Sequence, residues 1–410
     1  MLTPQELLEV IDTMQPLLDG LNAFITEDIV RRIMARLGRG EEFLLTGTDE
    51  WQLQMYQEAG GHLEAVQKEI QTFTGKSDAE VKAIFEDSGI RAWERDEAFY
   101  TAMGYEAMPL VESERIIRIL EDTYRRTNGS IHNFTRTTAK ASQQKLVNVL
   151  DDAHFKVMTG AQSYTAAVRD AVREVALQQT RVYYPTGHND TIETAVLRAV
   201  RTGVAQASGN MTLQGMVERD YDIIRVSAHL GARYGDGGEN PSNHFWWQGK
   251  LYSRTGETKD LPKFEEATGY GTGEGLCGWN CRHSFGPGDR EHNPYKDFDS
   301  EENKKAYDLS QKQRSYEAKI RESKRHILGL QTAIDNCTDE EAKAGLLLDY
   351  DKASLLLQKR NAAYNAFCEA NGLKKLNDRI SIAQWNRSQA SKATAAATRE
   401  RKRQADKQNS

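Results

Sequence analysis

Cysteine, histidine and arginine side chains gather between positions 227 and 283 of this sequence. The segment holds three of the nine histidines and two of the four cysteines, and its candidate site residues are His229, Arg233, His244, Cys277, Cys281 and His283. The spacing Cys277-x3-Cys281-x-His283 lies within the range seen at zinc sites, and His229 or His244 could supply a fourth ligand. One prediction is therefore a metal site, zinc by chemistry, held by His244, Cys277, Cys281 and His283.

Two further interpretations fit the same residues. In the first, the cysteines and histidines pack a glycine-rich core, with each imidazole bonded to a backbone carbonyl or another side chain. In the second, Cys281 is a nucleophile with a histidine as base, or Arg233 and the histidines hold an anionic ligand. The nominal third members of such a catalytic group are Asp236 and Glu274. All three interpretations predict that the side chains lie close together.

The elements that must position these residues are short strands and loops of defined conformation. Ile223, Ile224 and Val226 form a strand-like run, and positions 231–288 are rich in glycine and in aromatics that include Trp246, Trp247 and Trp279. Helical periodicity is lost throughout this stretch. The segment therefore predicts a small α+β module, in which loops carry the specific site.

Helices are predicted on the N-terminal side of this module. Capping boxes at 3–6 and 77–80 indicate helix starts. Apolar residues at spacings of three and four follow the first box, and Ile192, Val196, Val200 and Val204 repeat at a spacing of four before a predicted break at Gly209-Asn210. The six histidines outside the cluster are expected at the surface or at helix caps: His62, His132, His154, His188, His292 and His326.

Helices return after the module. A heptad seam runs from Leu309 to Ile334, and a second apolar stripe starts near Leu346, after a turn and a capping box at 338–341, and stops at Gly372. This pattern predicts an antiparallel, coiled-coil-like helical hairpin. The stretch from Asn386 contains seven basic residues against two acidic ones and predicts a flexible basic tail that could fold on an acidic partner.

The predicted fold is thus mainly α with a small α+β module. Four regions are expected: a helical N-terminal region at 1–130, an α+β domain with the Cys/His motifs at 131–298, a helical hairpin at 299–375, and the tail at 376–410. A length of 410 residues agrees with more than one structural unit.

Net charge, apolar runs and cysteine spacing argue against several classes of protein. A net charge of −6 argues against a protein that coats nucleic acid along its length. The sequence shows neither a signal peptide nor an apolar run long enough for a membrane span, which predicts a cytosolic chain without membrane contact. Four unevenly spaced cysteines do not form a disulfide scaffold.

Several motifs in a fixed order resemble the phage minor capsid protein 2 family, a relative of the Mu protein F-like head morphogenesis proteins. They are Ser-Ala-His-Leu-Gly-Ala-Arg at 227–233, His244 followed by Trp-Gln-Gly-Lys at 247–250, Thr-Gly-Tyr-Gly at 268–271, and Gly-Leu-Cys-Gly-Trp-Asn-Cys-Arg-His at 275–283. The resemblance implies a low-copy structural protein of the virion that associates with the portal during head assembly in the host cytoplasm.

The leading hypothesis is accordingly a head assembly protein, not an enzyme of cellular metabolism. Its partners would be the portal protein and other capsid proteins, bound through apolar helix stripes, and packaged DNA, bound through the basic tail. The alternative is a virion-associated transferase or hydrolase that uses the His/Arg/Cys cluster.

Overall fold

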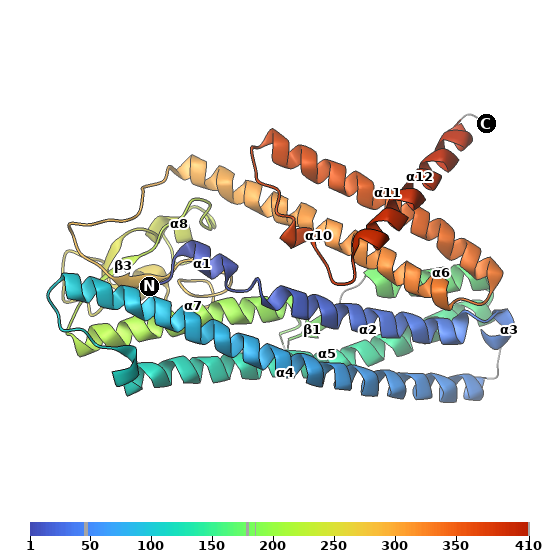
Figure 1. The fold of residues 1–410 in the computed structure, drawn as a ribbon, viewed down its shortest axis with the longest axis horizontal. Coiled ribbons are helices and arrows are strands. Elements are labelled where there is room, and N and C mark those ends of the chain that lie inside the picture. Colours follow the sequence, from blue (N-terminus) through green and yellow to red (C-terminus); the bar gives the residue numbers. More distant parts are fainter. Residues whose placement is uncertain (45–47, 178–179, 185, 409–410) are drawn as a thin grey trace. The chain divides into compact units, whose positions relative to one another are not determined.

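The computed structural model describes residues 1–44, 48–177, 180–184 and 186–408 (Figure 1). Helices dominate the described chain, and its strands form one two-stranded and one three-stranded antiparallel sheet, which confirms the predicted fold class. Two compact units are present. Unit 1 comprises Met1–Gln15, Thr74–Asn133 and Thr194–Gln311, and unit 2 comprises Pro16–Phe73, Phe134–Glu193 and Lys312–Ser410. These interleaved units differ from the four contiguous regions predicted.

Several long helices contribute residues to both units. The helices are α1 (Pro4–Glu9), α2 (Met14–Leu37), α3 (Glu41–Leu44), α4 (Thr48–Ala102), α5 (Glu114–Met158), α6 (Tyr164–Leu177), α7 (Ile192–Glu218), α8 (His244–Trp247), α9 (Phe264–Thr268), α10 (Ser300–Asn336), α11 (Glu340–Ala370) and α12 (Arg387–Gln408), with 3-10 turns η1 (Leu110–Glu112) and η2 (Asp378–Ile380). In the described part of the chain, no helix has both the length and the apolar character needed to cross a bilayer.

The predicted strand run forms the centre of a small sheet in unit 1. Strand β3 (Ile223–Val226) pairs antiparallel with β4 (Leu251–Ser253) on one side and with β5 (Phe285–Pro287) on the other. Ile224 lies opposite both Tyr252 and Pro287, and it is fully buried. Unit 2 holds the second sheet, a hairpin of β1 (Arg181–Tyr183) and β2 (Asn189–Thr191).

Helix α1 begins at the predicted capping box. The Thr3 hydroxyl accepts a hydrogen bond from the Glu6 backbone N–H, and the Glu6 carboxylate accepts from the Thr3 N–H at 2.8 Å. The same carboxylate pairs with two arginines of α4, Arg91 at 3.0 Å and Arg95 at 2.8 Å. Burial raises the pKa of Glu6, but the hydrogen bonds from Arg95 and Thr3 outweigh it and lower the pKa to about 2.

We expect Glu6→Gln to lower the melting temperature at neutral pH by about 2–4 °C, the effect of losing roughly 1 kcal/mol. The pKa of Glu6 is lower in the folded protein than its ordinary 4.5. Its contribution to stability is therefore present above pH 4.5 and is lost as the pH falls towards 2. Thermal unfolding across this range should show the difference from wild type shrinking in acid. Glu114→Gln, at a carboxylate that is 83% exposed, is the control, and a pH-independent difference for Glu6→Gln would contradict the assignment.

Two predicted helix boundaries are wrong. Helix α4 continues through the second capping box, because the buried Ser77 hydroxyl donates to the Thr74 carbonyl of the preceding turn instead of capping a new helix. Helix α7 likewise continues through Gly209-Asn210. A Cβ at Gly209 would lie 2.8 Å from the Phe285 ring and 3.0 Å from the Tyr270 hydroxyl. This glycine permits close packing between α7 and the sheet module, so it does not end the helix.

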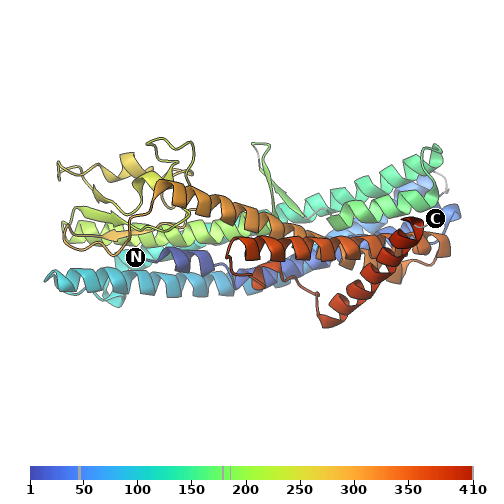
Figure 2. The same cartoon turned by 90° about the horizontal axis from the view of Figure 1, so that it is seen from above.

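The predicted hairpin is formed by α10 and α11, which run side by side in Figures 1 and 2. Gln313 contacts Tyr364, and Ser323 contacts Arg360, an order that makes the helices antiparallel. The predicted seam positions Ile320, Ile327 and Leu330 are fully buried. The second helix is capped by Asp339, whose carboxylate accepts from the Ala342 N–H, and not by the predicted Thr338.

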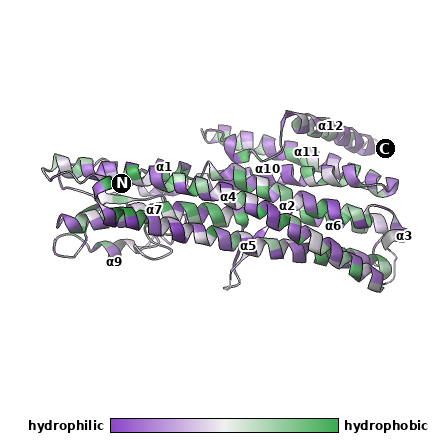
Figure 3. Cartoon of the chain, turned by 60° about the horizontal axis from the view of Figure 1, so that its bottom comes forward, coloured by the Kyte–Doolittle hydropathy of each residue, from purple (hydrophilic) through white to green (hydrophobic). Residues whose placement is uncertain are grey.

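The segment predicted as a flexible tail is mostly the helix α12, and Figure 3 shows that most of it is hydrophilic. Small residues at helical spacing are buried where α12 packs on α11, among them Ala393, Ala396 and Ala397. The buried Asp351 carboxylate of α11 accepts from Arg399 at 2.6 Å and also pairs with Arg403. The acidic partner on which this basic stretch folds is therefore within the same chain.

Candidate Cys/His site

The sheet of unit 1 positions the predicted site residues. His229 and Arg233 follow β3, His244 is the first residue of α8, and Cys277, Cys281 and His283 lie on the loop that enters β5. The Asn243 side chain caps α8 by accepting from the Trp246 N–H, which fixes the start of this short helix. Because β3 and β5 are paired, the segments that carry His229 and His283 run next to each other.

The loop that carries the cysteines is folded tightly on itself. The Leu276 N–H donates to the Thr268 carbonyl, and the Trp279 N–H donates to the Gly273 carbonyl at 2.7 Å. Cys277 and Asn280 both have φ of +57°, in the left-handed region that few side chains adopt. These turns fold the loop so that Cys277 and Cys281 are both buried.

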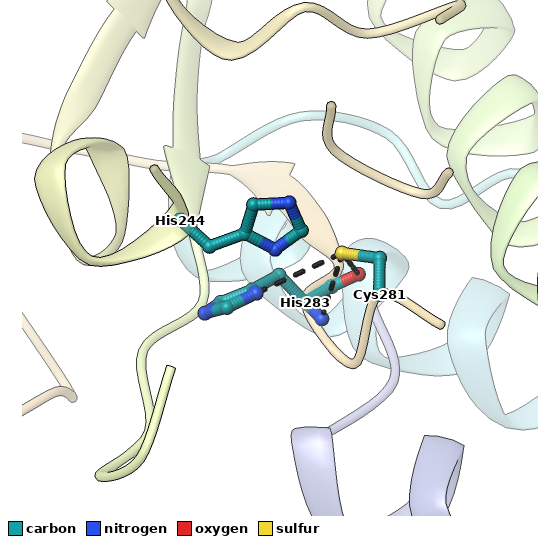
Figure 4. Close-up of side chains that lie close together, drawn as sticks. All are labelled: His244, Cys281 and His283. Atoms are coloured by element: carbon teal, nitrogen blue, oxygen red, sulfur yellow. Dashed lines mark hydrogen bonds between the residues drawn. The ribbon is translucent and has the colours of Figure 1, made fainter. Parts of the chain in front are cut away.

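His244, Cys281 and His283 point toward one another (Figure 4). One ligand atom from each lies within 4.8 Å of those of the other two, and all three residues are buried. The Cys281 Sγ is 3.7 Å from the His283 Nδ1. Among the predicted site residues, these are the three whose ligand atoms converge.

Hydrogen bonds fix the protonation of both rings. His244 Nε2 lies 2.8 Å from the Glu274 carbonyl oxygen, so it must donate. The Gln248 Oε1 accepts from the His229 backbone N–H, so His283 Nε2, at 3.0 Å from the same oxygen, must also donate. In each neutral ring the Nδ1 therefore carries the lone pair.

Burial keeps the three groups uncharged. Burial lowers the pKa of His244 to about 3 and that of His283 well below its ordinary value, and neighbouring histidines and arginines lower it further for His283. Burial also raises the pKa of the Cys281 thiol. At neutral pH the cluster thus consists of two neutral imidazoles and a thiol. An enclosed, protonated thiol is a weak nucleophile, so this arrangement does not favour the catalytic interpretation.

Three other predicted residues lie beside the cluster. The His229 ring stacks on His283 with centroids 4.4 Å apart, and its Nδ1 donates to the Leu230 carbonyl. The Cys277 thiol is directed at the His283 carbonyl oxygen, at 3.7 Å. Arg233 donates to the carbonyls of Glu274 and Trp279, so it holds the cysteine loop and not an anion.

Two residues of the site were not identified as functional from the sequence. Gln248 orients His283, and Trp247 packs against His244 and His283 with centroid distances of 4.6 and 4.8 Å. Both belong to the Trp-Gln-Gly-Lys motif at 247–250, and this motif is the sequence feature that could have identified them.

The surface or capping role predicted for isolated histidines is wrong for His62, which is fully buried in unit 2. Its Nδ1 contacts Asp28 at 2.7 Å and its Nε2 contacts Ser142 at 3.1 Å. This Asp-His-Ser order is that of a hydrolase triad. Ser142 lies inside α5, where backbone N–H groups are used in the helix and are unavailable to an oxyanion. The network instead links α2, α4 and α5 through buried, satisfied polar groups.

The other histidines divide between surface and interior. His154 is buried and stacks on Trp51 with centroids 4.5 Å apart, so its surface prediction is also wrong. The side chains of His132, His188 and His292 are 44%, 62% and 82% exposed, as predicted.

Comparison with known proteins assigns the family. The model of the family described as Phage minor capsid protein 2 matches residues 2–353, which include the whole Cys/His module and the first part of the hairpin. Neither the curated proteins nor the solved structures yield a match. The motifs at 227–283 thus lie within a match that spans most of the chain. The chain belongs to the phage minor capsid protein 2 family, and is a structural component of a bacteriophage capsid that resides in the virion and interacts with other phage structural proteins.

Proposed function

We propose that this minor capsid protein binds the portal protein at the interior of the head during assembly in the host cytoplasm. The observation that carries the proposal is a set of exposed apolar side chains on long helices of a capsid-family protein. A solvated helix normally keeps such residues scattered, and their pairing at helical spacing is typical of a docking face.

Two apolar pairs lie on α4 and α5 within unit 2. Leu53 and Tyr56 are 61% and 65% exposed, and Phe155 and Met158 are 65% and 47% exposed. Both pairs have i,i+3 spacing, so each forms a short strip on its helix. On α11, three leucines are at least 41% exposed: Leu347, Leu348 and Leu356. These strips can bury apolar area against helices of a partner, which supplies most of the favourable energy of such contacts.

Co-purification with the portal protein of the same phage tests the proposal. We expect a stable complex of the two folded proteins. We expect Leu53→Glu/Tyr56→Glu to weaken its affinity at least tenfold, because burying two carboxylates in the interface costs desolvation free energy. The control is Gln52→Glu/Gln57→Glu, which adds the same charges at exposed polar positions of α4. Absence of a complex with both proteins folded would contradict portal binding, and equal binding by both variants would exclude this strip.

A second candidate function is contact with packaged DNA through α12. Its exposed basic residues include Lys392, Arg401 and Lys402, while Asp351 pairs with Arg399 and Arg403. We expect weak DNA binding that falls steeply with salt and is reduced further by Lys392→Glu/Arg401→Glu/Lys402→Glu. The same substitutions at the exposed Lys304, Lys305 and Lys312 of α10 form the control. DNA binding that is equal in both variants would contradict a role for α12.

A further inference from the structure

We propose that His244, Cys281 and His283 form a binding site for a divalent transition-metal ion of the zinc type. The proposal concerns the interior of unit 1 and is independent of portal binding. It would make the cluster a cross-link between α8 and the loop that enters β5.

The spacing of the ligand atoms fits a zinc ion after a small contraction. With Zn–N of about 2.0–2.1 Å and Zn–S of about 2.3 Å, neighbouring ligand atoms of a tetrahedral site lie about 3.3–3.6 Å apart. The Cys281 Sγ and His283 Nδ1 are 3.7 Å apart, and all three ligand atoms lie within 4.8 Å of one another. Side-chain movements of roughly 1 Å therefore complete the geometry.

The groups around the ligands favour metal binding as well. Histidines that bind metals usually donate their second ring N–H to a carbonyl or carboxylate, which fixes the tautomer and turns the lone pair to the ion. His244 and His283 do this through the Glu274 carbonyl and the Gln248 side chain. Gln248 is itself held by the His229 backbone N–H. The donor set is thus oriented before any ion binds.

The ligand types select the ion. Two imidazoles and one thiolate suit zinc and similar borderline ions, whereas Mg²⁺ and Ca²⁺ require oxygen ligands. Binding converts the Cys281 thiol to a metal-bound thiolate, and the released proton passes to buffer. The Cys277 thiol is not among the ligand atoms that converge in the described part of the chain, so the protein supplies three ligands and the fourth coordination position is left to water or another external ligand.

Metal analysis of tag-free, full-length protein tests the proposal. After equilibration with zinc and removal of free ion, we expect one zinc per chain in the wild type. Cys281→Ser and His244→Gln are expected to retain less than a tenth of it, and Gln248→Leu is expected to weaken affinity about 10- to 100-fold. Cobalt substitution should give sulfur-to-cobalt charge-transfer absorption in the wild type that is absent in Cys281→Ser.

Two control variants distinguish zinc binding at this site from zinc binding elsewhere on the chain. Cys277→Ser changes the neighbouring buried thiol, and His292→Gln removes an imidazole that is 82% exposed. Both should keep one zinc per chain. Circular dichroism verifies folding. If Cys281→Ser does not fold, the zinc content of His244→Gln tests the proposal. Folded wild type without zinc would overturn the proposal, as would zinc retained by a folded Cys281→Ser or His244→Gln.

Discussion

Gly275→Ala is expected to destabilise unit 1 at or above the upper end of the roughly 1–3 kcal/mol range for overpacking. A Cβ at this position would lie 2.2 Å from the Gly269 carbonyl oxygen and 2.6 Å from the Thr268 carbonyl oxygen. These are backbone atoms, so they cannot rotate away as a flexible side chain would. The Leu276 N–H bond to Thr268 must break or lengthen, and the loop that carries Cys277 and Cys281 must move.

Hydrogen exchange resolved along the chain measures this effect. Amides of 268–283 should lose most of their protection, because the loop is held by its own backbone bonds. Gly129→Ala is the control, since nothing lies within 4 Å of its added Cβ and it sits inside α5. That substitution should stabilise the protein by about 0.5–1 kcal/mol. Unchanged protection in Gly275→Ala would show that the loop is less constrained than these contacts indicate.

Arg325→Leu is expected to destabilise unit 2 by about 3–5 kcal/mol, the usual cost of removing one partner from a buried ion pair. The guanidinium donates to Asp19 at 2.8 Å and to Glu193 at 2.9 Å. Both carboxylates are over 90% buried. Without Arg325 the two carboxylates would keep Arg321, which lies 3.4 Å from Glu193, as a neighbouring cation. The Glu193 charge already acts on Asp19 and raises its pKa, and two buried like charges repel each other more strongly than two exposed ones.

The defect should diminish in acid. Burial, together with repulsion from Glu193, already raises the pKa of Asp19 although Arg325 opposes this rise. A carboxyl whose pKa is raised on folding stabilises the protein below its unfolded pKa and loses this contribution as the pH rises. Removing Arg325 raises that pKa further, so the difference between variant and wild type should be largest at neutral pH. Denaturant unfolding at several pH values measures it.

Arg31→Leu provides the matched control for Arg325→Leu. Arg31 pairs with Glu27 at 3.4 Å on the surface of α2, and their side chains are 45% and 34% exposed. Exposed pairs of this kind contribute about 0.3–0.5 kcal/mol. A similar effect of the two substitutions would mean that Arg325 is not the principal charge partner of Asp19 and Glu193.

Features that depend on neighbouring residues in the sequence were predicted from it. The α1 cap rests on Thr3 and Glu6, and the buried faces of α7 and α10 rest on repeats of three and four. Strand β3 follows from a run of β-branched residues. These patterns act within one helix or strand, so the local sequence is sufficient to predict the element.

Features that depend on distant partners were not predicted. Ser77 and Gly209 carry local signals for helix ends, but both helices are continuous. Ser77 is buried and donates to the Thr74 carbonyl, and Gly209 lies against the Phe285 ring. The helix α12 packs on α11 through buried alanines and through Asp351, which binds Arg399 and Arg403. Similarly, His62 becomes part of a network through Asp28 and Ser142, which lie 34 and 80 positions away.

The candidate site was predicted in part for the same reason. The spacing of Cys277, Cys281 and His283 placed them on one loop, and clustering with His244 pointed to a shared location. Which thiol meets the imidazoles depends on left-handed turns at Cys277 and Asn280, and a spacing pattern does not encode them. The roles of Gln248 and of the Glu274 carbonyl depend on tertiary placement.

The division of each unit among three stretches of chain has a consequence for biosynthesis. Unit 1 pairs its first residues with segments that extend to Gln311, and unit 2 requires residues from Pro16 through the C-terminal helix. During translation neither core can close until most of the polypeptide has left the ribosome, and the loop entropy of joining such remote segments slows folding. Nascent chains would expose the apolar faces of α2 and α4 in the meantime, which makes chaperone capture a natural stage in their maturation.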